Sequence, residues 1–179
     1  MWMISVTDPD IPPEGKRRVW FHSRIHAGEV TSTLTMLGIM DIATEDSVLG
    51  RHLRKEMIFN IVPLVNVDGV WLGHTRWDSQ GIDPERQWGN PSRIPETKNL
   101  QNYVDAFMGG PNPIEVALNL HSTKGNFKDT FFFKHVYPSV SRDFEQIQQN
   151  YINDLDNATL LFDNRSPATS QLHDYQYIE

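Results

Sequence analysis

Two short, nearly unbroken apolar runs constrain the fold of this chain more than any other feature. Residues 57–65 read MIFNIVPLV, and residues 116–120 read VALNL. A strand with one face in water alternates apolar and polar side chains, whereas a continuous apolar run is typical of a strand covered on both faces. The two runs therefore predict interior strands of a sheet that has helices on both sides.

Further strand signals lie at the start of the chain. Residues 1–6 and 18–21 are rich in β-forming side chains, and the turn-forming segment 8–15 between them predicts a hairpin. Residues 66–113 carry only a short helical patch, at 98–107. Loops this long in a compact domain are usually functional, so we expect the segment to contribute to a site.

Helical spacing of apolar residues completes the pattern. It begins at Thr31, with Gly50 as a stop signal, and recurs at 141–155 behind a capping Ser139 or Ser141. Strands that alternate with helices predict an α/β fold: a mixed, mostly parallel sheet with helices on both faces.

Composition narrows the class of protein. The 179 residues fit one domain, 1–179, and a net charge of −7 argues against nucleic acid as a partner. The sequence has no cysteine, so any metal must be held by His, Asp or Glu. No apolar run is long enough to cross a membrane and no signal peptide is visible, so we expect a soluble protein, with a cytoplasmic location slightly favoured. The oligomeric state is left open.

The strongest chemical signal is VWFHSRIHAGEV at residues 19–30, between the end of a strand and the start of a helix. His26 and Glu29 are three positions apart, and Gly28 allows a tight turn, so one imidazole and one carboxylate can point at a common metal. The alternative is a partly solvated turn with no ligand.

A second histidine can complete this half-site. His22 and His26 are four apart, which in an extended strand separates them by about 13 Å, so His22 is expected to be structural. His121 follows the buried run 116–120 and is either a hydrogen-bonded core histidine or a ligand. Together with His26 and Glu29 it forms the two-histidine, one-carboxylate set of a catalytic zinc site with an open fourth position.

The order of motifs along the chain resembles a known family. The motifs are HxxE at 26–29, NVDG at 66–69, Arg76, GIDPERQW at 81–88 and LHS at 120–122. In this order they resemble the M14 family of zinc carboxypeptidases. The resemblance implies the fold of that family and a zinc metallohydrolase that cleaves a peptide or related amide bond with zinc-activated water.

The resemblance also implies residue roles. Three residues match the zinc ligands of the family: His26, Glu29 and His121. Asp83 matches the carboxylate that orients the first ligand histidine. Arg76 matches the arginine that polarises the scissile carbonyl, and Arg86 the one that binds the terminal carboxylate of the substrate. The alternative for each arginine is a surface salt bridge.

The sequence departs from the family pattern in two places. Glu85 stands where most members have Asn beside the carboxylate-binding arginine; it would repel a carboxylate, so we expect it to contact an amino group of the substrate. Only 58 residues follow His121, and the glutamate that acts as general base is either Glu179 or, as we expect, a residue beyond the end of an incomplete domain.

Two alternative functions follow from these departures. One is an amidohydrolase similar to aspartoacylase or succinylglutamate desuccinylase, acting on a small acylated amino acid. The other is a metal-binding or ligand-binding domain that lacks the general base. If the motifs are coincidental, His26, Glu29, His121 and Arg86 will not cluster in space.

Overall fold

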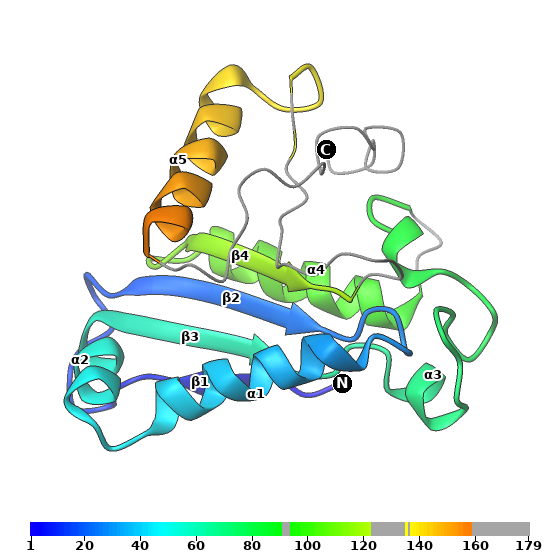
Figure 1. Cartoon of the computed structure of the whole chain (residues 1–179), viewed down its shortest axis with the longest axis horizontal. Helices are drawn as coiled ribbons and strands as arrows, with labels where there is room; N and C mark the ends of the chain where they lie inside the picture. The colour runs from blue at the N-terminus through cyan, green and yellow to red at the C-terminus, as the bar shows by residue number, and fades with distance from the viewer. Residues whose placement is uncertain (91–93, 123–134, 136, 159–179) are drawn as a thin grey trace. The chain divides into compact units, whose positions relative to one another are not determined.

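The structure, a computed structural model, describes residues 1–90, 94–122, 135 and 137–158 (Figure 1). The chain divides into two compact units, Met1–Thr123 and Lys124–Glu179. The first unit carries the sheet and all the described candidate site residues. None of the described helices is long and apolar enough to span a membrane. The assignment of residues 1–179 to a single domain stays a prediction.

A four-stranded sheet forms the centre of the first unit. Its strands are β1 (Ile4–Val6), β2 (Arg17–Ser23), β3 (Met57–Val62) and β4 (Ile114–Leu120), in the order β1-β3-β2-β4. The strand β2 is parallel to both β3 and β4, while β1 is antiparallel to β3. The predicted mixed, mostly parallel sheet is therefore confirmed. The predicted interior position holds for β3 but is wrong for β4, which lies at the edge of the described sheet and is only partly buried.

The predicted hairpin is wrong. Ile4 lies opposite Ile61, so β3 separates β1 from β2 in the sheet. The turn-forming residues 8–15 only link two strands that are not neighbours. Strand propensity identifies a strand but not its partner, and β2 instead has the two apolar strands β3 and β4 on its two sides.

Six helices are described. They are α1 (Val30–Thr44), α2 (Val48–Glu56), α3 (Val67–Trp71), the 3-10 helix η1 (Pro84–Arg86), α4 (Pro95–Met108) and α5 (Arg142–Ala158). Helix α5 belongs to the second unit. Ser141 caps α5 as predicted, because the Ser141 Oγ accepts the Phe144 N–H at 3.1 Å. Gly50 is not a stop: it lies inside α2, where a Cβ would sit 2.4 Å from the Glu45 carbonyl oxygen.

Helices cover both faces of the sheet, as predicted. Figure 1 shows α1 in front of the strands and α4 behind them. Val19 and Phe59 pack with Met36 of α1 on one face, while Trp20 packs with Leu100 of α4 on the other. Because β2 and β4 are parallel neighbours, their carboxyl ends meet at one edge of the sheet, where ligands commonly bind in α/β folds.

Candidate metal centre

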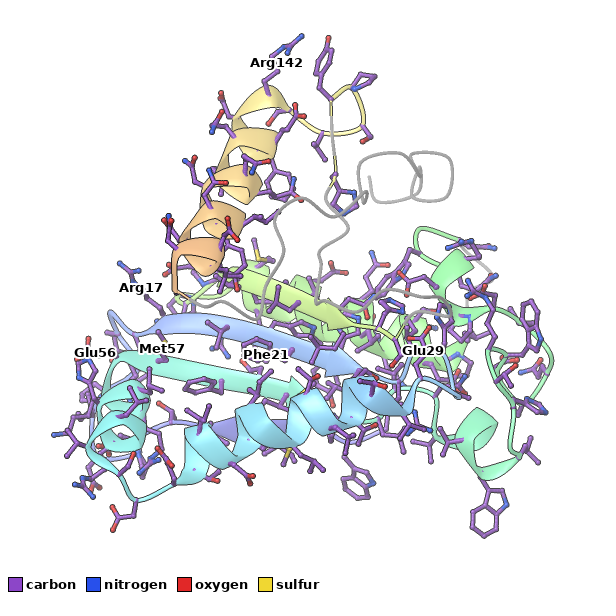
Figure 2. The ribbon with its side chains drawn as sticks, viewed as in Figure 1. Arg17, Phe21, Glu29, Glu56, Met57 and Arg142 are labelled. Atoms are coloured by element: carbon purple, nitrogen blue, oxygen red, sulfur yellow. The ribbon has the colours of Figure 1, made fainter. Side chains whose placement is uncertain are left out.

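The turn after β2 brings two of the predicted ligands to this edge. Arg24 has a φ of 57°, a left-handed conformation that reverses the chain. Its guanidinium donates to the Ala27 carbonyl at 2.9 Å and to Thr33 Oγ1 at 3.1 Å, which ties the turn to the first turns of α1. Figure 2 shows Glu29 where β2 ends and α1 begins.

The structure brings His26, Glu29 and His121 together. His26 Nδ1 lies 2.7 Å from Glu29 Oε1, and His121 Nδ1 lies 2.8 Å from Glu29 Oε2. Each residue offers one ligand atom, and these atoms lie within 4.8 Å of one another. Two imidazole nitrogens and one carboxylate oxygen are the donor set of a catalytic zinc site, so the residues fit the metal.

Their contacts perturb the ionisation of the ligands. Burial favours neutral Glu29, but hydrogen bonds from His121 and His26 prevail and lower its pKa to about 2. Burial likewise favours neutral His26, yet its bonds to Asp83 and Glu29 raise its pKa to about 9. The carboxylate is therefore ionised at neutral pH, as a ligand must be.

Asp83 lies behind the first histidine, as the resemblance implies. Its Oδ1 lies 3.2 Å from His26 Nε2 and accepts the Glu85 N–H at 3.0 Å, while Oδ2 accepts from Arg76 Nε at 2.6 Å. Although burial opposes ionisation, His26 and Arg76 lower the pKa of Asp83 to about 2. Asp78, almost fully buried, holds this loop by accepting the Ile82 N–H at 2.7 Å.

Asn66 accounts for the NVDG motif, whose structural role cannot be predicted from the sequence alone. Its amide nitrogen donates to the carbonyl oxygens of Ile25 at 3.3 Å and Trp77 at 3.0 Å, and its oxygen accepts the Gly69 N–H at 2.9 Å. The buried side chain thus joins the loop of His26 to the loop after Arg76. Its bond to Gly69 is a local helix cap, but the bonds to Ile25 and Trp77, 41 and 11 residues away, cannot be inferred from spacing.

The other predicted site residues lie around this cluster. The Arg76 side chain is 38% exposed and ion-paired with Asp83. Arg86 is half-buried in η1. The Glu85 carboxylate is buried, and both of its oxygens accept from Asn119 Nδ2, at 3.2 and 3.3 Å; burial raises its pKa. Glu179 lies outside the described residues.

Gly28 lies where the loop of His26 comes close to the backbone of Thr75. Its N–H donates to the Thr75 carbonyl at 2.7 Å, and a Cβ would lie 2.7 Å from that oxygen and 2.9 Å from Thr75 Cα. We expect Gly28→Ala to destabilise the protein by about 1–3 kcal/mol in denaturant unfolding, because backbone must move. As a control, Gly38→Ala in α1 meets no atom within 4 Å and should be neutral or stabilising. Equal effects would contradict this account.

His22 lies on the α4 face of β2 and is not among the clustered ligand atoms. Its Nδ1 accepts from Trp20 Nε1 at 2.9 Å, in keeping with a structural role. Burial, reinforced by His121, lowers the pKa of His22 to about 3. His22 therefore stays neutral in the folded protein, while in the unfolded chain it binds a proton below about pH 6.5.

This difference predicts a pH-dependent loss of stability. As pH falls from about 6.5 towards 3, His22 reduces the free energy of unfolding by up to about 1.4 kcal/mol per pH unit. We expect His22→Gln to remove this contribution to the pH dependence. The difference in the free energy of unfolding between wild type and variant should therefore become smaller as the pH falls. Urea unfolding of the zinc-free proteins from pH 7.5 to 5 measures it. Parallel stability curves would show that His22 does not stay neutral.

Comparisons with known proteins identify the family of this chain. The sequence profile described as Zinc carboxypeptidase matches residues 1–177. The chain belongs to this family. Cytosolic carboxypeptidase 6 of Mus musculus is 27% identical over 155 residues, covering 84% of this chain and 28% of that protein. Its namesake in Caenorhabditis elegans is 34% identical over 123 residues, covering 66% of this chain and 27% of that protein.

A solved structure supports the same fold. The metallo-carboxypeptidase from Burkholderia cenocepacia aligns with a TM-score of 0.76 and 22% identity, covering 92% of this chain and 43% of that one. The chain therefore spans less than half of that solved structure and under a third of the two curated relatives. The chain is a member of the zinc carboxypeptidase family. Its mixed sheet with helices on both faces is the fold that it shares with these proteins.

Proposed function

We propose that this chain is part of a zinc-dependent, carboxypeptidase-like hydrolase that cleaves a peptide or related amide bond. One observation carries the proposal: two imidazole nitrogens and a carboxylate oxygen lie within 4.8 Å of one another at the carboxyl edge of the sheet. The family match supports it independently. The names of the relatives refer to the cytosol, and a cytosolic location is part of this proposal.

Each residue of the site has a separate proposed role. His26, Glu29 and His121 would hold zinc, which when bound supplies Lewis-acid chemistry that activates water for attack on a carbonyl. Asp83 fixes the ring of His26 through Nε2. Arg76 is partly exposed beside the cluster and stabilises negative charge on the carbonyl oxygen.

Arg86 is proposed to bind the terminal carboxylate of the substrate through its guanidinium fork. It follows Asp83 by three residues, within the short helix that Asp83 caps, so the same loop that orients a ligand would also place the substrate.

Substrate preference tests the proposal. The zinc-loaded protein that contains this chain together with the general base should hydrolyse an N-blocked dipeptide with a free carboxylate faster than the same dipeptide amidated at its C-terminus, and a chelator should abolish the activity until zinc is restored. Cleavage of acetyl-aspartate or succinyl-glutamate instead would identify the acyl-amino-acid hydrolase. Zinc binding without hydrolysis of any of these would identify a binding domain.

A further inference from the structure

The carboxylate of Glu85 lies on the side of His121 away from Glu29. His121 Nδ1 is 2.8 Å from Glu29 Oε2, whereas its Nε2 is 3.7 Å from Glu85 Oε2. The Glu85 side chain is 4% exposed. The second ring nitrogen of His121 therefore faces a buried carboxylate, at a separation longer than a hydrogen bond but within the range of an ion pair.

The same arrangement exists at His26. There Nδ1 lies 2.7 Å from Glu29 Oε1, and Nε2 lies 3.2 Å from Asp83 Oδ1. Both histidines thus sit between the shared carboxylate of Glu29 and a second carboxylate of their own. Carboxylates that accept from the remote nitrogen of a ligand histidine fix its tautomer and its ring orientation.

Glu85 is held where this role requires it. Its N–H donates to Asp83 Oδ1 at 3.0 Å, which fixes the backbone, and Asn119 Nδ2 contacts both carboxylate oxygens. Asn119 lies in β4 and His121 directly follows that strand, two positions further along the chain. Both residues contact the Glu85 carboxylate, so the end of β4 and the residue after it supply both the amide that holds the carboxylate and the histidine that faces it.

We propose that Glu85 is a positioning residue for His121, as Asp83 is for His26, and that it does not contact the substrate. The proposal rests on the proposed function, because it assigns a metal to the cluster. A side chain that is 4% exposed, with both oxygens bonded to Asn119, has little surface left for a substrate amino group. A buried carboxylate also needs nearby positive charge, which a bound zinc ion would supply, and a hydrogen-bond donor, which a ligand histidine offers through its second ring nitrogen.

Zinc affinity and the cobalt spectrum test this role. We expect Glu85→Ala to weaken zinc binding about 10- to 100-fold in competition with a chromophoric chelator, and Asp83→Asn to do the same. The visible absorption of the cobalt(II)-loaded Glu85→Ala protein should shift, since His121 is less well oriented. Glu85→Gln keeps the shape and one acceptor oxygen, so it should recover part of the affinity.

Glu115→Gln is the matched control, because this β4 glutamate is 51% exposed and paired with Arg17 away from the cluster. It should leave both readouts unchanged. The proposal is overturned if both Glu85 variants keep the zinc affinity and the cobalt spectrum of wild type but bind an amino-bearing competitive inhibitor with altered affinity. That result would show that Glu85 contacts the substrate. Failure of the wild-type chain to bind zinc would overturn the proposed function itself. Should Glu85→Ala fail to fold, the isosteric Glu85→Gln variant still decides between these outcomes.

Discussion

Replacing His26 with alanine is expected to abolish the stabilisation of this protein by zinc. At a free zinc concentration about 1,000 times the Kd, binding to the folded state adds about 4 kcal/mol, or roughly 8–16 °C in Tm for a chain of this size. The His26→Ala protein loses one of three clustered ligand atoms, and the two that remain hold zinc far more weakly. Thermal unfolding with and without zinc measures the effect.

His52→Ala is the control for this experiment. His52 lies on α2 and is exposed, so its removal should leave the zinc-induced shift of wild type intact. An equal shift in the His26→Ala protein would show that zinc binds elsewhere, and the assignment of His26, Glu29 and His121 as ligands would fail.

Removing Arg76 is expected to lower turnover strongly while the zinc ligands stay in place. A fixed donor aimed at a developing oxyanion contributes about 10²- to 10³-fold in kcat, so Arg76→Gln should lower kcat by that factor with little change in KM. A phosphonate analogue of the transition state should lose affinity by the same factor, which calorimetry can measure independently of turnover.

Two arginine variants separate this role from others. Arg86→Gln should instead raise KM about 10- to 100-fold for substrates with a free carboxylate, because a charged hydrogen bond is lost in ground and transition state alike. Arg51→Gln removes an exposed arginine that pairs with Asp46 and should change neither constant. A fall in kcat for Arg86→Gln with normal kinetics for Arg76→Gln would reverse the two assignments.

The sequence was sufficient for the class of fold and for the cluster. The apolar run 57–65 holds β3, which lies inside the sheet and is buried almost throughout, whereas β4 lies at the edge of the described sheet and is only partly buried. Parallel strands share one carboxyl edge, so placing His26 and His121 after two such strands also predicts that they meet. These features depend on local pattern and on one rule of topology.

The remaining features depend on contacts between distant segments. The edge position of β1 is set by its pairing with β3, about 55 residues away, which periodicity within 1–6 cannot show. Glycine often ends helices, so Gly50 resembles a stop in the sequence, whereas in the structure the close Glu45 backbone requires a glycine there. The burial of Glu85 depends on Asn119, which no spacing within the GIDPERQW motif reveals.

The separation of the ligands along the chain has a consequence for folding. His26 and Glu29 are three residues apart and can approach one another within a single turn, but Glu29 and His121 are 92 residues apart. The complete site therefore forms only after β2 and β4 have paired, and such distant pairings are slow to close. During refolding, zinc binding should therefore report the assembly of the sheet, after the helices have formed.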